Sequence, residues 1–208
     1  MSFFNFNDAP PQQDSDLIPA KTMAKVLMVI RPGGHGPEGW LKLADSGFEY
    51  LDAEFTLTSA PHAKRKFWGN MGVGGPTDGH QKAAQITRAT LRAALESARN
   101  INPKDESEKA RSARQVNGWD DFNELEFAVE IGIEKDKKGD YPDKNKIAKV
   151  ITPDHAKYQE IMSGNTIVPA GVQKQNTEAA PAWTPPAAEK SSANPMPAWE
   201  NPVPEWAR

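Results

Sequence analysis

The chain has 208 residues, of which 38% are hydrophobic and 18 are proline. Eight of these prolines lie at or after Pro169, so the composition predicts one globular domain followed by a tail that does not fold by itself. The absence of cysteine excludes disulfide frameworks, thiolate metal sites and thiol nucleophiles, and it favours a reducing compartment. Residues 1–6 do not have the pattern of a signal peptide, and no segment approaches the roughly 20 apolar residues of a membrane span. We therefore expect a cytoplasmic protein.

The formal net charge of −3 conceals a basic middle region. Residues 61–114 contain 11 basic residues against 5 acidic residues. Non-specific affinity for nucleic acid comes from local basic surface, so the acidic balance of the whole chain does not argue against such a partner.

Residues 23–31 alternate apolar and mixed positions, which predicts a first strand with Lys25 and Arg31 on its outer side. A loop rich in glycine and proline follows at residues 32–39 and leads to Trp40. Residues 41–44 then begin a long second strand, which a turn or bulge interrupts at residues 45–47.

The stretch from 48 to 73 is the centre of the predicted fold. Apolar residues recur at period two in residues 48–58 and again in residues 64–73, and a connector containing proline separates the two runs, so a hairpin is expected. Its outer face would carry two aromatic residues beside a basic cluster: Tyr50, Trp68, Lys64, Arg65 and Lys66. Flat rings beside fixed positive charge suit single-stranded nucleic acid. The same pattern is also typical of a sheet face that a loop or a second subunit covers, and this alternative stays open.

Two helices are expected next. The first runs from about residue 79 to 100, with Thr77 or Asp78 as its N-cap and an apolar stripe toward the core. The second runs from residue 103 to about 115, with Asn102 as its N-cap, and Gly118 closes it.

The last part of the predicted domain is a second hairpin. Residues 125–133 alternate strictly, residues 136–140 form a turn, and residues 144–151 return with Lys144 and Lys146. A short helix that starts at residues 152–154 and runs to about residue 162 completes the domain.

Three strands, a helical insertion and two further strands are the element order of the oligonucleotide-binding fold. We therefore expect a mainly β protein, a five-stranded Greek-key barrel with two helices between strands three and four. An open α+β sheet is the alternative. The predicted organisation is a flexible N-terminal arm at residues 1–16, the binding domain at 17–165 and a disordered tail at 166–208.

The tail repeats a Pro-x-Trp unit around Trp183, Trp199 and Trp206. Disordered segments rarely repeat tryptophan, so these residues are candidate anchors for a partner protein. Chance drift in a low-complexity tail is the competing interpretation.

No pattern of catalytic residues stands out. Residues 74–81 have the glycine spacing of a phosphate-binding loop but lack its Lys and its hydroxyl residue, and the histidines are too scattered for a zinc site. Asp120, Asp121 and Glu126 could form a metal-dependent nuclease site, although glutamates at period two are typical of any solvated strand face. We expect a protein that is not an enzyme and that uses no cofactor or metal.

Five features, in their order along the chain, resemble a family of phage and prophage proteins: residues 17–20, residues 64–68, the Ala-rich helix after them, residues 117–118 and residues 139–147. That family is encoded among phage replication and recombination functions and looks like single-stranded DNA-binding proteins with oligonucleotide-binding folds. The similarity covers residues 15–152. This chain departs from the pattern in its larger helical insertion at 102–117 and in a tail tip that is aromatic but hardly acidic.

The residues and the resemblance together predict a sequence-tolerant single-stranded DNA-binding protein of phage replication or recombination that acts in a bacterial host cell. This prediction is compatible with a homo-oligomer and with replication or recombination proteins as partners of the C-terminal tail. The predicted DNA-binding residues are Lys25, Arg31, Trp40, Tyr50, Lys64, Arg65, Lys66, Trp68, Lys144 and Lys146. The alternative is a phage assembly or adaptor protein that recruits partners through its Pro-x-Trp tail.

Overall fold

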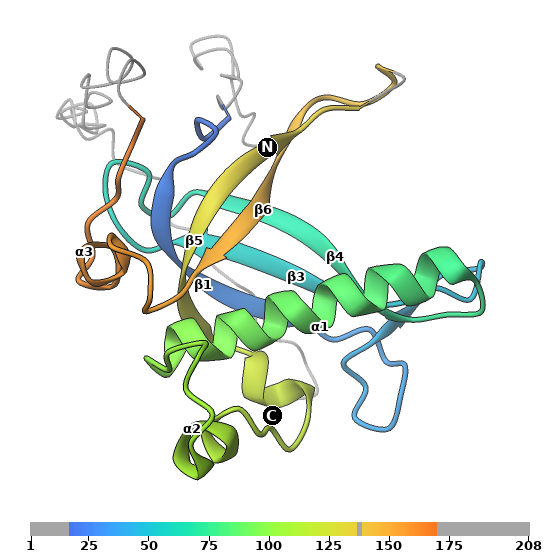
Figure 1. Cartoon of the computed structure of the whole chain (residues 1–208). Coiled ribbons are helices and arrows are strands. Elements are labelled where there is room, and N and C mark those ends of the chain that lie inside the picture. The colour runs from blue at the N-terminus through green and yellow to red at the C-terminus, as the bar shows by residue number, and fades with distance from the viewer. Residues whose placement is uncertain (1–16, 137–138, 170–208) are drawn as a thin grey trace, which may run out of the picture. The chain divides into compact units, whose positions relative to one another are not determined.

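A computed structural model describes residues 17–136 and 139–169 (Figure 1). Its elements are β1 (Met23–Arg31), β2 (Lys42–Leu43), β3 (Glu49–Leu57), β4 (Lys66–Gly74), α1 (Asp78–Ala98), α2 (Glu108–Ala113), the 3-10 helix η1 (Trp119–Phe122), β5 (Leu125–Glu134), β6 (Lys144–Ile151) and α3 (Tyr158–Met162). The predictions for the arm at residues 1–16 and for Trp183, Trp199 and Trp206 lie outside the described residues.

The strands form one antiparallel sheet, so the predicted mainly β class is confirmed. The long strands follow the order β4-β3-β1-β5-β6, and the short β2 pairs with β3 at Glu49 and Tyr50, beyond the end of β1. The interruption at residues 45–47 is therefore a turn between two paired strands. Among the described residues no strand pairing joins β4 to β6, so the sheet is open there and closure into a barrel stays a prediction.

Alternation at period two decides which face of the sheet is buried. Val26 and Met28 of β1 and Leu51 of β3 are fully buried, while their neighbours in sequence are mostly on the other face. The rings of Phe55 and Phe67 stack across the β3–β4 pair with their centroids 5.1 Å apart. Helix α1 lies across one end of the sheet (Figure 1) and adds its apolar stripe to this core.

The predicted cap of α1 is confirmed, because Thr77 Oγ1 accepts a hydrogen bond from the His80 amide at 3.2 Å. The predicted boundaries of the second helix were wrong. Asn102 uses its side chain to accept the Lys104 amide in a local turn, and helix α2 starts only after Ser107, whose hydroxyl accepts the amide of Ala110. A local turn of this kind competes with helix formation.

The last helix, α3, is also shorter than predicted, because the chain turns through residues 152–157 before the helix begins. This helix covers the second face of the sheet where Ala128 of β5 and Ile151 of β6 are buried against Tyr158 and Ile161. The Tyr158 hydroxyl also donates a hydrogen bond to the Ser97 carbonyl at 2.5 Å, which ties α3 to the end of α1.

A buried carboxylate attaches the segment after α1 to that helix. Glu96 Oε1 lies 3.0 Å from Arg92 Nε and 2.7 Å from Arg114 Nε, and the Glu96 side chain is only 4% exposed. Arg114 also donates hydrogen bonds to the backbone carbonyls of Asn102 and Asp105. The ion pair between Glu96 and Arg114 therefore also holds the loop before α2 in place.

We expect Glu96→Gln to lower the free energy of unfolding by about 3 kcal/mol, because it removes the counter-charge of a nearly buried Arg114. Chemical denaturation measures this difference. Glu106→Gln, which changes an exposed carboxylate of the same region, should change stability by less than about 1 kcal/mol. Equal effects of the two substitutions would contradict this role of Glu96.

Candidate nucleic-acid interface

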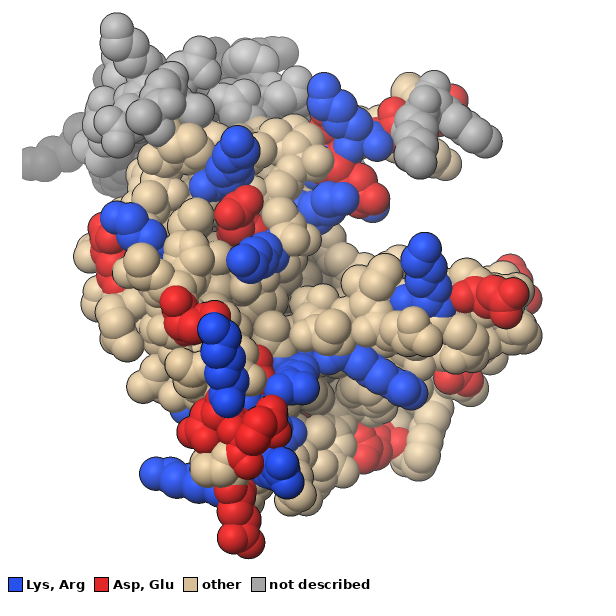
Figure 2. Space-filling view, in the orientation of Figure 1, with Lys and Arg blue, Asp and Glu red and all other residues tan. Residues whose placement is uncertain are grey.

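A groove of about 1200 Å³ separates β4 from β6, with α1 along its side. Consecutive residues of both strands line it, from Phe67 to Met71 on β4 and from Lys146 to Val150 on β6. The groove therefore runs between the two outer edges of the open sheet. Figure 2 shows the corresponding hollow between the β5–β6 hairpin and α1, with both basic and acidic side chains on the hairpin side.

Trp68 offers the aromatic surface of this groove. It is 49% exposed, because it points away from the face that buries its neighbour Phe67. Its indole Nε1 donates a hydrogen bond to Glu54 Oε2 at 3.1 Å, directly across the β3–β4 pair. Lys66 donates to the other oxygen of Glu54 at 2.6 Å. The ring is thus held at one edge while part of its surface stays open to solvent.

The same Glu54 carboxylate is kept ionised by its donors. The hydrogen bond from Lys66 holds the pKa of Glu54 below its ordinary value. Burial opposes this shift, and the indole of Trp68 lowers the pKa further. A charged acceptor makes a stronger hydrogen bond to the indole, which favours one orientation of the Trp68 ring.

An ion cluster around a buried carboxylate lies beside Trp68 on the same face. Asp52 has a side chain that is 7% exposed, and its two oxygens lie 2.5 Å from Arg31 Nη2 and 2.5 Å from Lys42 Nζ. Burial acts to raise the pKa of Asp52, but hydrogen bonds and attraction from Lys42 and Arg31 outweigh it and hold the pKa below the ordinary value. The cluster carries two positive charges against one negative charge.

The opposite wall of the groove is the lysine-bearing edge of β6. Lys144 lies 3.4 Å from Glu134, whereas Lys146 and Lys149 make no ion pair within the described part of the chain. Lys149 was missed in the sequence, where only the first two lysines of the strand were selected. Lys149 is the third exposed lysine of β6, and it follows the irregularity in the β5–β6 pairing at Glu130 and Ile131. The run of three lysines in one predicted strand was the feature of the sequence that could have identified it.

The charge of the groove is more balanced than the sequence suggested. Arg31, Lys144, Lys146 and Lys149 line it, and so do four carboxylates. Two of these carboxylates, Asp52 and Glu96, are buried and each holds two cations. The other two, Glu134 and Asp154, are exposed, so the solvent-facing charge combines the three lysines of β6 with two carboxylates.

The structure brings four of the ten predicted residues to the groove: Arg31, Trp68, Lys144 and Lys146. Lys66 adjoins them through Glu54, and Lys64 and Arg65 lie in the turn that leads into β4. The other three lie elsewhere for identifiable reasons. Lys25 pairs with Glu126 at 2.8 Å, Trp40 packs against the core, and one face of Tyr50 stacks on Phe48 at 5.5 Å.

The alternative nuclease site does not assemble. Asp121 accepts the backbone amide of Asn117, Asp120 stands on η1, and Glu126 is paired with Lys25 on the sheet. Within residues 17–136 and 139–169, no three His, Cys, Asp or Glu side chains are grouped as metal ligands. No helix in this described part is long and apolar enough to span a bilayer.

Comparison of the chain with protein-family models, with curated proteins and with solved structures finds no match. The functional interpretation therefore rests on the residues of the groove and on the order of the strands.

The lowered pKa of Asp52 gives a stability difference that depends on pH. A carboxyl group with a depressed pKa in the folded state stabilises the protein above its ordinary value of 3.8 and loses this contribution as the pH falls through the folded pKa. The wild type should therefore be more stable than Asp52→Asn at neutral pH, and the difference should shrink in acid. Urea unfolding of both proteins across this pH range checks it, and a difference independent of pH would contradict it.

Proposed function

We propose that this protein binds single-stranded DNA without strong sequence preference, as a coating protein of phage replication or recombination. The observation that carries the proposal is the half-exposed Trp68 ring, fixed by Glu54 in a groove whose opposite wall bears three lysines. Bases stack on such a ring whatever their identity, and lysines track the phosphates. Binding without catalysis is part of the proposal.

The strand order supports the same function. An oligonucleotide-binding barrel places its helix between the third and fourth long strands, and it binds its ligand on the face of the second and third. In this chain α1 lies between β4 and β5, and Trp68 lies on the β3–β4 pair. The open side of the sheet between β4 and β6 is where the fifth strand would close such a barrel on the third.

The groove also suits a flexible strand better than a duplex. Its walls are β-strand edges and the side of α1, with exposed apolar surface at Trp68 and Ile86. Unpaired bases have apolar faces that such surface can cover, whereas a duplex keeps those faces stacked inside and presents mainly phosphate and sugar.

Trp68→Ala should weaken binding of a fluorescein-labelled oligo(dT) by about 5-fold or more, because one base stack contributes about 1–3 kcal/mol. Fluorescence anisotropy at low salt measures the affinity. Leu43→Ala is the matched control, since Leu43 is another exposed apolar residue but does not line the groove. Unchanged affinity in Trp68→Ala, with the fold intact by circular dichroism, would remove Trp68 from the site.

The lysines of β6 should determine the salt dependence. Replacing Lys144, Lys146 and Lys149 by alanine should reduce the slope of log affinity against log salt by about 2, since each phosphate contact on a single strand contributes about 0.7. A control protein with Lys82, Lys109 and Lys157 replaced by alanine should keep the wild-type slope, because these lysines lie outside the groove. Equal slopes in the two triple variants would contradict the assignment.

A further inference from the structure

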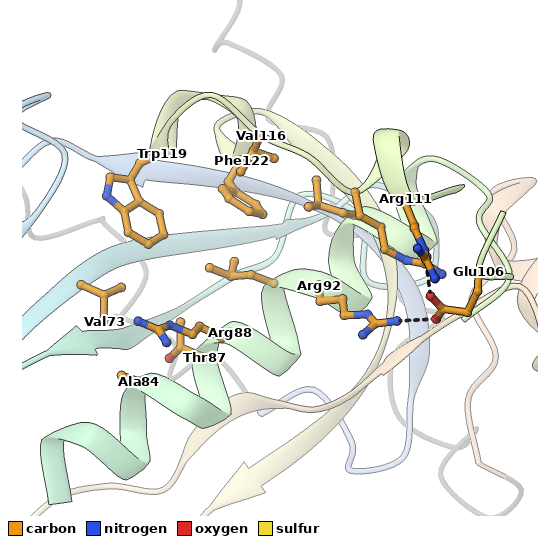
Figure 3. Close-up of a pocket in the computed structure, with 13 residues that line it drawn as sticks. Val73, Ala84, Thr87, Arg88, Arg92, Glu106, Arg111, Val116, Trp119 and Phe122 are labelled. Atoms are coloured by element: carbon orange, nitrogen blue, oxygen red, sulfur yellow. Dashed lines mark ion pairs between the residues drawn. The ribbon is translucent and has the colours of Figure 1, made fainter. Parts of the chain in front are cut away.

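A second pocket, of about 520 Å³, lies on another side of α1, between this helix and the segment that contains α2 and η1. Its walls are largely apolar, and the apolar residues are Val73, Ala84, Leu91, Leu95, Val116, Trp119 and Phe122 (Figure 3). Val116 is 38% exposed although it is a large aliphatic residue. The segment that contains α2 and η1 thus covers one side of α1 but leaves a pocket between itself and the helix.

Arginines surround this apolar space. Arg88 lines the pocket and makes no ion pair within the described part of the chain. Arg92 and Arg111 lie 3.8 and 3.5 Å from Glu106, and both guanidinium groups belong to side chains that are more than half exposed. Ion pairs this exposed are weak, so an incoming carboxylate can replace Glu106 or join it at little cost.

The cations stand at two separate ends of the pocket. Figure 3 shows Arg88 beside Val73 below Trp119, whereas Arg92 and Arg111 converge on Glu106 at the opposite end. A ligand that satisfies both ends must carry negative groups on either side of an apolar middle.

We propose that this pocket binds an acidic peptide segment of a partner protein, with a bulky apolar side chain seated between α1 and η1. Carboxylates on the two sides of that anchor would reach Arg88 at one end and the Arg92–Arg111 pair at the other. Arginine holds carboxylates in a planar, bidentate manner, and an apolar anchor in a pocket with charged surroundings is the usual form of a binding hot spot.

The chemistry of the walls favours a peptide over a polynucleotide. Bases have polar edges that lose their hydrogen bonds to water on burial, and apart from Thr87 and the charged side chains the lining of the pocket is aliphatic or aromatic. An aliphatic or aromatic side chain has no such requirement. The pocket is therefore distinct from the groove in both lining and partner, and the proposal does not depend on DNA binding.

The test uses the full chain and a fluorescein-labelled synthetic peptide in which Trp and Leu are flanked by glutamates. We expect the wild type to bind this peptide and to bind at least about 10-fold more weakly the same peptide with glutamines in place of the glutamates. Arg88→Glu and Val116→Glu should each weaken binding of the acidic peptide by about 10-fold or more. Lys82→Glu, a charge reversal on α1 outside the pocket, should leave binding within about 2-fold of the wild type.

Several results would overturn the proposal. These are equal binding of the two peptides, absence of binding to the wild type, and equal loss in Arg88→Glu and Lys82→Glu. Displacement of the peptide by oligo(dT), with oligo(dT) binding itself weakened by Arg88→Glu, would assign the pocket to nucleic acid instead. Concentration-dependent dimerisation that Val116→Glu abolishes would assign it to a second copy of this chain. Since oligo(dT) binding is measured separately, failure here leaves the proposed DNA-binding function standing.

Discussion

The stacking of Phe55 on Phe67 determines what the rest of the sheet presents to solvent. These rings meet across the β3–β4 pair on the buried face, so the adjacent residues Glu54 and Trp68 meet on the other face. Side chains alternate strictly along a strand, and a slip of one residue would exchange the two sets. The apolar core thereby keeps Trp68 beside its hydrogen-bond partner and at the edge of the groove.

Helix α1 borders both the β4–β6 groove and the pocket beneath α2 and η1. Ile86, Ala89 and Ala93 face the groove between β4 and β6, whereas Arg88 and Leu91 face the pocket beneath α2 and η1. One helix can therefore support a polynucleotide on one side and a partner protein on another. Glu96 lines the groove and also holds Arg114 of the pocket, so a single buried carboxylate contributes to the geometry of both.

The sequence predicted the long strands and α1 because their signals are local. Alternation over β1, β3 and β5 and the cap at Thr77 need no knowledge of distant residues. The second helix was mispredicted because a local turn at Asn102 competes with helix formation, and the sequence does not show which of the two forms. The candidate site was predicted only in part. Burial of Tyr50 against Phe48, and the approach of β6 toward β4 that makes Lys149 a groove residue, both depend on tertiary contacts.

The measurement that tests the central claim most directly is photocrosslinking of an oligonucleotide containing 5-iodo-deoxyuridine to the wild-type protein, followed by peptide mapping. Iodouracil crosslinks to aromatic rings on which it stacks, so the site of the adduct reports where a base lies. The proposed function predicts an adduct on the β4 peptide at Trp68, which high salt suppresses. An adduct confined to Trp40 or Trp119, or no adduct at low salt, would contradict the assignment of the β4–β6 groove to single-stranded DNA.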